Sequence, residues 1–310
     1  MNLSVLRSHT VGTPPWSNGR VHPVPVACQA TIQVSVMASA PSIPPGPVRR
    51  RLLSELSWPE VAQGAARTGS TVVWPFGAIE QHGPHLPLST DALFAERVCT
   101  AVLERLPHDL PIWQLPTQSL GFSHEHRGFA GTLSLPPELL LGLVVAVGSD
   151  LAAAGFQRLV LLNAHGGQIA LLEVAARQLH AARPDLAVLP CFLWRGPEGI
   201  AQRIPEPERQ RGLHAGLAET SLMLHLAEDL VGPERQADGL LREPPEGWSL
   251  EGQAPCAWLT RELSSSGVIG DPAGASAELG QALFEALVEG WRCRLHSLLN
   301  SDWPPGTLRG

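Results

Sequence analysis

The chain of 310 residues contains no lysine and no tyrosine, so its 22 basic residues are all arginines. Without lysine it has neither a Schiff-base amine nor the lysine of a phosphate-binding P-loop, which excludes the enzyme classes that use them. The net charge of -7 argues against a nucleic-acid partner, because binding a polyanion needs clustered positive charge. The one basic cluster, Arg49 to Arg51, is too short for that role and fits a solvated surface.

Cysteine pairs and long apolar runs are also missing. The five cysteines include no C-x-x-C pair, so neither a disulfide framework nor a structural zinc site is indicated. No apolar run approaches the roughly 18 to 20 residues that a membrane span needs, and the beginning of the chain lacks the apolar core of a secretory signal. We therefore expect a cytoplasmic protein without membrane or nucleic-acid partners.

Residues 1–50 contain no acidic residue and are rich in proline, with PSIPPGP at 41–47. Such a segment cannot bury enough apolar surface to form a core, so we expect it to be disordered. Met37 is an alternative translation start, and a transit peptide is the competing interpretation. The remainder is predicted to form one catalytic domain over residues 51–300, followed by a tail at 301–310.

Beyond residue 50, continuous apolar runs alternate with amphipathic stretches. Strands that are apolar throughout indicate a sheet buried on both faces, which is typical of parallel strands connected by helices. The fold class predicted is therefore α/β, with helices on both sides of a mostly parallel sheet. The strands are expected to begin at Thr71, Pro111, Arg158 and Leu186, and the helices to span residues 91–106, 136–154, 168–182, 215–228 and 273–299.

The most informative stretch, WPFGAIEQHGPHLPLSTD at residues 74–91, follows the first strand. Glu80 and His82 stand two positions apart, and in an extended chain such residues project from the same face. Glycine and prolines then interrupt regular structure before a helix begins near Asp91. We expect this turn to return Asp91 to the region of Glu80 and His82.

Two other strand ends carry similar chemistry. NAHGGQ, residues 163–168, follows the third strand, and its glycines allow a sharp turn that leaves His165 at the edge of the sheet. HAGLAETS, residues 214–221, opens a helix after the fourth strand, with His214 and Glu219 facing inward. Because sites in open α/β sheets form at the carboxyl ends of strands, we expect these segments to meet there.

Glu80, His82, Asp91 and His165 are ligand types for zinc, manganese or iron. An E-x-H pair alone arises by chance, and a lone histidine beside glycines is equally a core or capping residue. Their joint placement at strand ends favours a metal site. Two ions sharing Asp91 would hold one activated water between them, so the predicted chemistry is metal-assisted hydrolysis.

These segments resemble the creatininase family of metal-dependent amidohydrolases. The family's first motif, G-x-x-E-Q-H-G-P-H-L-P-L-x-T-D, is matched by residues 77–91. The resemblance extends over residues 53–299. The other matching stretches are GFSHEHRGFAGTLSL at 121–135, NAHGGQ, HAGLAETS, and GVIGDPAGAS at 267–276.

The resemblance implies a three-layer α/β/α domain that binds two divalent ions and assembles as a hexamer or another homo-oligomer. By motif position, Glu80 and His165 are ligands of one ion. His82 is a ligand of the other, and Asp91 bridges both. A bridging hydroxide is then expected to attack an amide or formamide carbon, while His214 passes a proton to the leaving nitrogen.

One departure from creatininase itself affects the second ion. Where that enzyme has a tyrosine and a metal-binding glutamate, this chain has Gly166 and Gly167. We expect Glu219 to replace the missing ligand or to take a catalytic role. The competing interpretation is that Glu219 only caps a helix or pairs with Arg127. Creatinine is then not the expected substrate.

Further polar groups lie close to the motifs. For His85, Glu125 and His126 we expect hydrogen bonds to the ligands rather than coordination. Trp194 and Arg195, at the end of the fourth strand, are expected either to line the pocket or to pack elsewhere.

The principal functional hypothesis is a dimetal hydrolase of a non-peptide C–N bond in a cyclic amide or formamide. Family members that carry H-G-G include a deformylase and a peptidase of the mycofactocin precursor, so a peptidase trimming a small precursor peptide is the close alternative. A non-catalytic metal-binding assembly protein and a metal-dependent isomerase or lyase are further alternatives.

Overall fold

The computed structural model describes residues 51–237, 239–252 and 254–304. The predictions for residues 1–50, for Met37 as a start, and for the end of the tail lie outside these residues. Within the described part the chain builds a four-stranded sheet in the order β2-β1-β3-β4, and every neighbouring pair is parallel. The predicted α/β class with a parallel sheet is therefore confirmed. The strands are β1 (Thr71–Phe76), β2 (Ile112–Gln114), β3 (Arg158–Asn163) and β4 (Ala187–Phe192).

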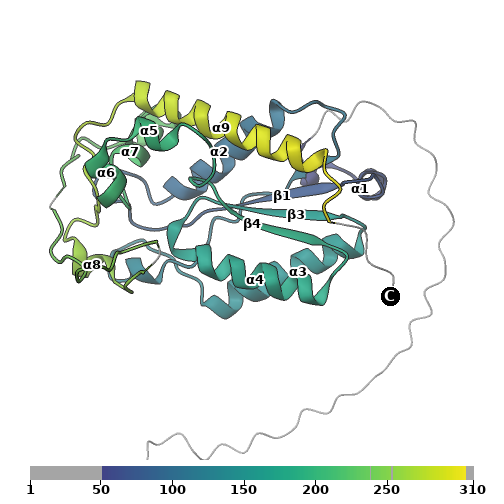
Figure 1. Ribbon diagram of the computed structural model, residues 1–310, viewed down its shortest axis with the longest axis horizontal. Helices are drawn as coiled ribbons and strands as arrows, with labels where there is room; N and C mark the ends of the chain where they lie inside the picture. The colour runs from purple at the N-terminus through teal and green to yellow at the C-terminus, as the bar shows by residue number, and fades with distance from the viewer. Residues whose placement is uncertain (1–50, 238, 253, 305–310) are drawn as a thin grey trace, which may run out of the picture. The chain divides into compact units, whose positions relative to one another are not determined.

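The sheet separates two apolar cores. In β1, Val73 packs in one core, whereas Val72 and Trp74 pack in the other. Side chains of a strand alternate between its faces, so a strand that is apolar at every position requires cover on both sides. Figure 1 shows this cover: α2 and α9 lie on one face, and α3 and α4 on the other.

The five long predicted helices are present, and the shorter ones were not predicted. The helix expected over 215–228 begins later, at Leu217, because Ala215 has a positive φ of 54° and Gly216 is extended. The sequence did carry a signal for the first helix: Ser57 and Glu60 form a capping box. The helices are α1 (Trp58–Ala65), α2 (Thr90–Glu104), α3 (Pro137–Ala153), α4 (Ile169–Ala182), α5 (Ile200–Arg203), α6 (Glu206–Arg211), α7 (Leu217–Leu226), α8 (Thr260–Leu263) and α9 (Ala277–Leu299).

The strand order creates a crevice at the carboxyl edge of the sheet. The chain leaves β1 through α2 toward β2, on one side, and leaves β3 through α4 toward β4, on the other. The connections after the neighbouring strands β1 and β3 therefore diverge to opposite faces, and ligands of open α/β sheets bind at such a switch point. The segments around α5, α6, α7 and α8 lie beyond this edge (Figure 1).

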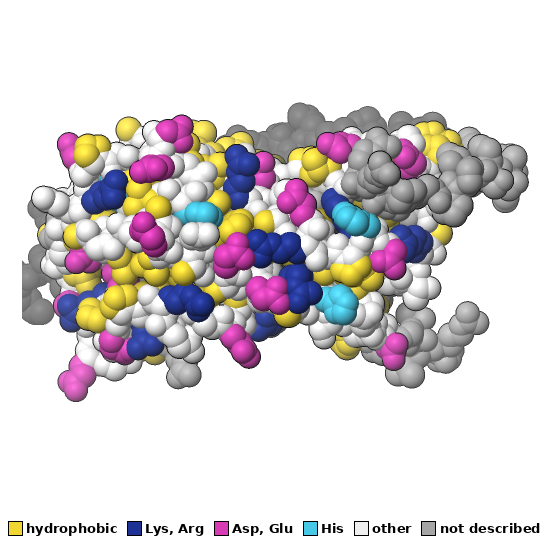
Figure 2. Space-filling model, turned by 90° about the horizontal axis from the view of Figure 1, so that it is seen from above, with side chains coloured by type: hydrophobic (Ala, Val, Ile, Leu, Met, Phe, Trp, Pro, Cys, Tyr) yellow, Lys and Arg dark blue, Asp and Glu magenta, His cyan; other side chains and the backbone are white. Residues whose placement is uncertain are grey.

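The face that carries α9 presents both signs of charge. Figure 2 shows acidic and basic side chains interspersed on it, without a field of one sign. Arg105 pairs with Glu285 at 2.7 Å, and Arg292 pairs with Glu289 at 2.7 Å. Among the described residues, no helix is both long and apolar enough to cross a membrane.

Substituting Leu161→Ala is expected to lower the free energy of unfolding by about 2–5 kcal/mol, because this fully buried side chain of β3 would leave a cavity. Leu139→Ala, on α3, is the matched control, since that side chain is 57% exposed. Denaturant unfolding followed by circular dichroism measures both. Equal losses for the two variants would contradict the described core.

Candidate metal centre

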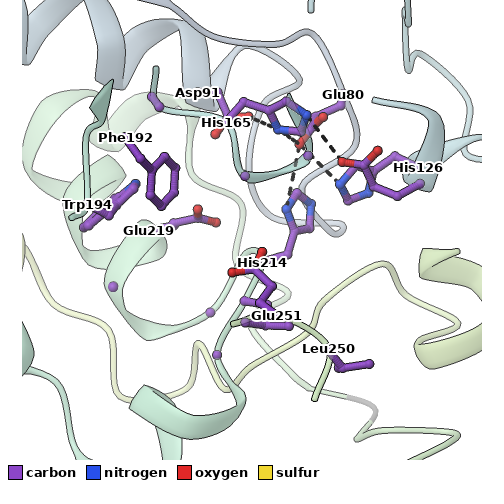
Figure 3. A pocket seen from close by; sticks show the side chains of 18 of the residues that line it. Glu80, Asp91, His126, His165, Phe192, Trp194, His214, Glu219, Leu250 and Glu251 are labelled. Atoms are coloured by element: carbon purple, nitrogen blue, oxygen red, sulfur yellow. Dashed lines mark ion pairs between the residues drawn. The ribbon is translucent and has the colours of Figure 1, made fainter. Parts of the chain in front are cut away.

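The predicted site residues meet at the carboxyl edge of the sheet, and Figure 3 labels all of them except His82. All are buried except Glu219, which is partly exposed to the adjacent pocket. The structure thus brings together every predicted ligand and the predicted proton carrier, although their roles stay predictions. They are Glu80 and His82 after β1, Asp91 in the first turn of α2, His165 after β3, His214 before α7, and Glu219 in the first turn of α7.

Three histidines share one arrangement. In each, one ring nitrogen faces a main-chain carbonyl oxygen, which only accepts, so that nitrogen carries the proton. The other nitrogen of the neutral ring then has its lone pair directed at the carboxylates. Metal-ligating histidines are oriented in this way. The bonds run from His82 Nδ1 to the Glu80 carbonyl (3.2 Å), from His165 Nε2 to the Phe122 carbonyl (2.9 Å), and from His214 Nε2 to the Gln81 carbonyl (2.6 Å).

Four candidate groups of ligand atoms occur among the described residues, and Asp91 belongs to two of them; the other two join Glu80 to His82 and His214, and to Glu125 and His126. His165 Nδ1 lies 3.2 Å from Glu80 Oε1 and 3.1 Å from Asp91 Oδ2. His82 Nε2 lies 3.4 Å from Asp91 Oδ1. The atoms of Glu80, Asp91 and His165 lie within 4.8 Å of one another, as do those of His82, Asp91 and Glu219. This geometry fits two ions that share one carboxylate, as the predicted bridge requires.

The buried carboxylates of the site favour the binding of positive charge. Both carboxylate oxygens of Glu80, Oδ2 of Asp91 and Nε2 of His82 are buried, and the ion-pair contacts of these two carboxylates are with imidazoles of the cluster, at 3.1 to 3.9 Å. Burial favours a neutral imidazole, yet the nearby carboxylates, Asp91 foremost, raise the pKa of His82 to about 9. Conversely, despite burial, the imidazoles hold the pKa of Asp91 far below its usual range. Divalent cations supply this charge and suit a donor set of imidazole and carboxylate.

Glu219 anchors the chain that enters α7 and faces the site. Its Oε2 accepts a hydrogen bond from the Ala215 amide at 2.7 Å, one residue before the N-cap Gly216, so it ties down the approach to the helix rather than capping the helix itself. The same carboxylate belongs to the ligand group with His82 and Asp91. Burial raises the pKa of Glu219 to about 7, against the opposing charge of His82. No ion pair joins Glu219 to Arg127 within the described residues, so the two roles that remain, the bond to Ala215 and a place in the ligand group, are compatible with each other.

His126 has the opposite orientation. The Gln81 side-chain oxygen accepts from the Gly83 amide at 2.9 Å, which fixes the amide so that its Nε2 donates to His126 Nδ1 at 2.8 Å. The proton of His126 is then on Nε2, which lies 3.3 Å from Glu80 Oε1. This geometry supports the expectation that His126 orients a ligand rather than coordinates. Glu125 Oε1 similarly lies 3.4 Å from His165 Nε2, behind the ring.

A cavity of about 820 Å³ opens beside the two ligand groups. Of the two places considered for Trp194 and Arg195, Trp194 lines this cavity, whereas the Arg195 guanidinium lies over the Phe192 ring and faces a smaller cavity of about 250 Å³. Most of the wall was not predicted, because loops and short helices contribute much of it and their sequences carry little periodic signal. Its apolar members include Phe122, Phe192, Ile200, Leu250 and Trp258.

Comparison with known proteins agrees with this geometry. The model of the family described as "Creatininase: Creatinine amidohydrolase" matches residues 54–295. The chain belongs to the creatininase family. It is 37% identical over 236 residues to a mycofactocin precursor peptide peptidase of Mycobacterium tuberculosis, covering 72% of this chain and 83% of that protein. It is a hydrolase of this family, as the sequence motifs predicted.

Solved creatininase structures share the fold. The crystal structure of creatinine amidohydrolase (creatininase) is 29% identical, with a TM-score of 0.67, and the match covers 82% of this chain and 99% of that one. Another, described as "Creatininase Mn", is 28% identical with a TM-score of 0.65, covering 82% and 100%. The three-layer architecture expected from the resemblance is thus confirmed. The name of the second structure includes manganese, which is consistent with a metal site in this chain.

The substitution Asp91→Asn is expected to reduce bound metal from about two ions per chain to fewer than one, because Asp91 is the carboxylate common to both ligand groups. Inductively coupled plasma mass spectrometry after zinc or manganese reconstitution gives the ratio. Asp150→Asn, an exposed position on α3, is the control and should retain both ions. Full occupancy in Asp91→Asn would exclude the shared-carboxylate arrangement.

Glu219→Gln is expected to bind about one ion per chain, since only the group with His82 loses a carboxylate and the Glu80, Asp91 and His165 group stays intact. The amide retains the oxygen that accepts from Ala215, so that hydrogen bond persists. Metal content and melting temperature are measured together. Two ions in this variant would assign Glu219 to the bond with Ala215 alone.

Proposed function

We propose that this protein is a metal-dependent peptidase that hydrolyses a C–N bond in a short peptide. The observation that carries the proposal is the cavity beside the two ligand groups, about 820 Å³ in volume and bounded largely by apolar side chains. A volume of this size suits a ligand of many atoms. The similarity to the mycofactocin precursor peptide peptidase supports the same substrate class. The peptide alternative is therefore preferred to the cyclic amide or formamide that the sequence first suggested.

The chemistry proposed is amide hydrolysis at the carboxylate and imidazole cluster. Two divalent ions, held by Glu80, Asp91 and His165 and by His82, Asp91 and Glu219, would acidify a water molecule and polarise the scissile carbonyl. All of these side chains except Glu219 are buried, which limits contact with bulk water and strengthens each electrostatic interaction.

His214 is proposed to move the proton. Its Nε2 is bound to the Gln81 carbonyl, so Nδ1 is the nitrogen with the free lone pair. Nδ1 lies 3.9 Å from Glu80 Oε1, at the boundary between the ligand groups and the cavity. From there it accepts a proton from the attacking water and returns it to the departing amine. Because Nδ1 also falls within the ligand group of Glu80 and His82, measurements of metal content must accompany tests of this role.

A second candidate substrate is a cyclic amide or formamide, which the likeness to creatinine amidohydrolase favours. One difference from creatininase lies directly after His165. At Gly167 the end of the Glu125 side chain occupies the space that a Cβ would enter, so the Glu125 carboxylate lies where creatininase has a glutamate. Assembly into a hexamer or another homo-oligomer also belongs to the proposal, and sedimentation measures it.

Purified protein reconstituted with zinc or manganese is expected to cleave members of an unmodified short-peptide library, with greatest turnover for peptides that have apolar residues beside the scissile bond. Mass spectrometry of the products identifies the bond. Creatinine and N-formyl amines are expected to remain intact. Chelation should abolish cleavage, readdition of metal should restore it, and Asp91→Asn serves as the inactive control. Turnover confined to creatinine or formamides would overturn the peptidase proposal.

A further inference from the structure

We propose that Thr220, supported by His85, is a positioning residue for the proton-carrying His214. The inference rests on the proposed function, because it concerns the orientation of His214, the proton carrier in that function. The feature that carries it is Ala215, which is the only non-glycine residue with a positive φ in the described part of the chain. Strained backbone of this kind persists only where surrounding contacts hold it.

Ala215 connects two rigid elements. Before it, the His214 main chain bonds in both directions with Ile269, through contacts of 3.0 and 2.8 Å. After it, the chain enters α7 at Leu217. The left-handed conformation at Ala215 therefore sets the angle between the bridge and the helix, and so the direction in which the His214 ring leaves the main chain.

Side chains of α7 hold both ends of the strained residue. The Ala215 amide donates to Glu219 Oε2 at 2.7 Å, and the Ala215 carbonyl accepts from Thr220 Oγ1 at 3.3 Å. The hydroxyl has one proton, which goes to the carbonyl, so Oγ1 accepts from His85 Nε2 at 2.8 Å. Thr220 and His85 are 0% and 1% exposed. This chain of bonds is thus shielded from water, which could otherwise replace the hydroxyl.

Further contacts fix the orientation of the His214 ring. The His214 ring lies between those of His82 and His126, with centroids 4.2 Å from each. Its Nε2 bond to the Gln81 carbonyl, at 2.6 Å, completes the orientation. A change of the Ala215 dihedral angles would rotate Nδ1 away from the Glu80 carboxylate, and misplacement of a reacting group by about 1 Å can cost about a hundredfold in rate. Thr220 itself does not line the cavity, so its effect acts through His214.

Thr220→Val tests the inference, since it removes the hydroxyl and keeps the shape. We expect kcat for peptide cleavage to fall about 10- to 100-fold, while KM and metal content stay within about twofold. Thr220→Ser, which keeps the hydroxyl, should restore most of the rate. His85→Leu, which leaves Thr220 without its donor, should lower kcat in the same direction. Thr71→Val is the matched control: this buried hydroxyl also donates to a main-chain carbonyl, that of Gly69 at 2.7 Å, but at the far end of β1.

A kcat for Thr220→Val within twofold of an active wild-type enzyme would overturn the inference, as would equal losses in Thr71→Val. An inactive wild-type protein would instead count against the proposed function. Crystal structures then decide the positioning role alone: displacement of His214 Nδ1 from Glu80 in Thr220→Val supports it, and an unchanged 3.9 Å separation refutes it.

Discussion

The buried carboxylate of Asp91 lies between two imidazoles, and most of the site is organised around it. An ionised carboxylate away from water is costly unless opposite charge is close. Here one oxygen faces His82 at 3.4 Å and the other faces His165 at 3.1 Å. Because both histidines direct an unprotonated nitrogen inward when neutral, the cluster favours bound cations. This arrangement is consistent with a metal site.

The sheet brings the side chains of this cluster together. β1 and β3 are hydrogen-bonded neighbours, and their following loops pass to opposite faces, so Glu80 and His165 meet although 85 residues separate them in the sequence. Asp91 joins them because α2 begins directly beside the end of β1, and a Cβ at Gly77 would collide with the main chain of Ala92. The required glycine thus permits the close approach that brings the Asp91 carboxylate to Glu80 and His165.

Contacts among buried side chains surround the cluster, whereas loops and short helices contribute much of the wall of the cavity. Glu208 shows how this wall is tied to the fold: its buried carboxylate accepts from the amides of Leu217 and Asp271, at 2.7 and 2.9 Å. The start of α7 is thereby joined to the segment that also bridges His214.

The sequence by itself determined the strands, the long helices and the ligand types. Strong apolar runs and the spacing of Glu80, His82 and Asp91 are local properties, so they could be recognised without a structure. Tertiary structure alone decided the rest, because it depends on contacts between distant segments. It showed that Glu219 combines a hydrogen bond to the Ala215 amide with a place in the cluster, that His126 presents its protonated nitrogen to Glu80, and that Arg195 turns away from the cavity. The positive φ of Ala215 could not be predicted from the sequence pattern either, because side-chain contacts in the folded structure hold that dihedral angle.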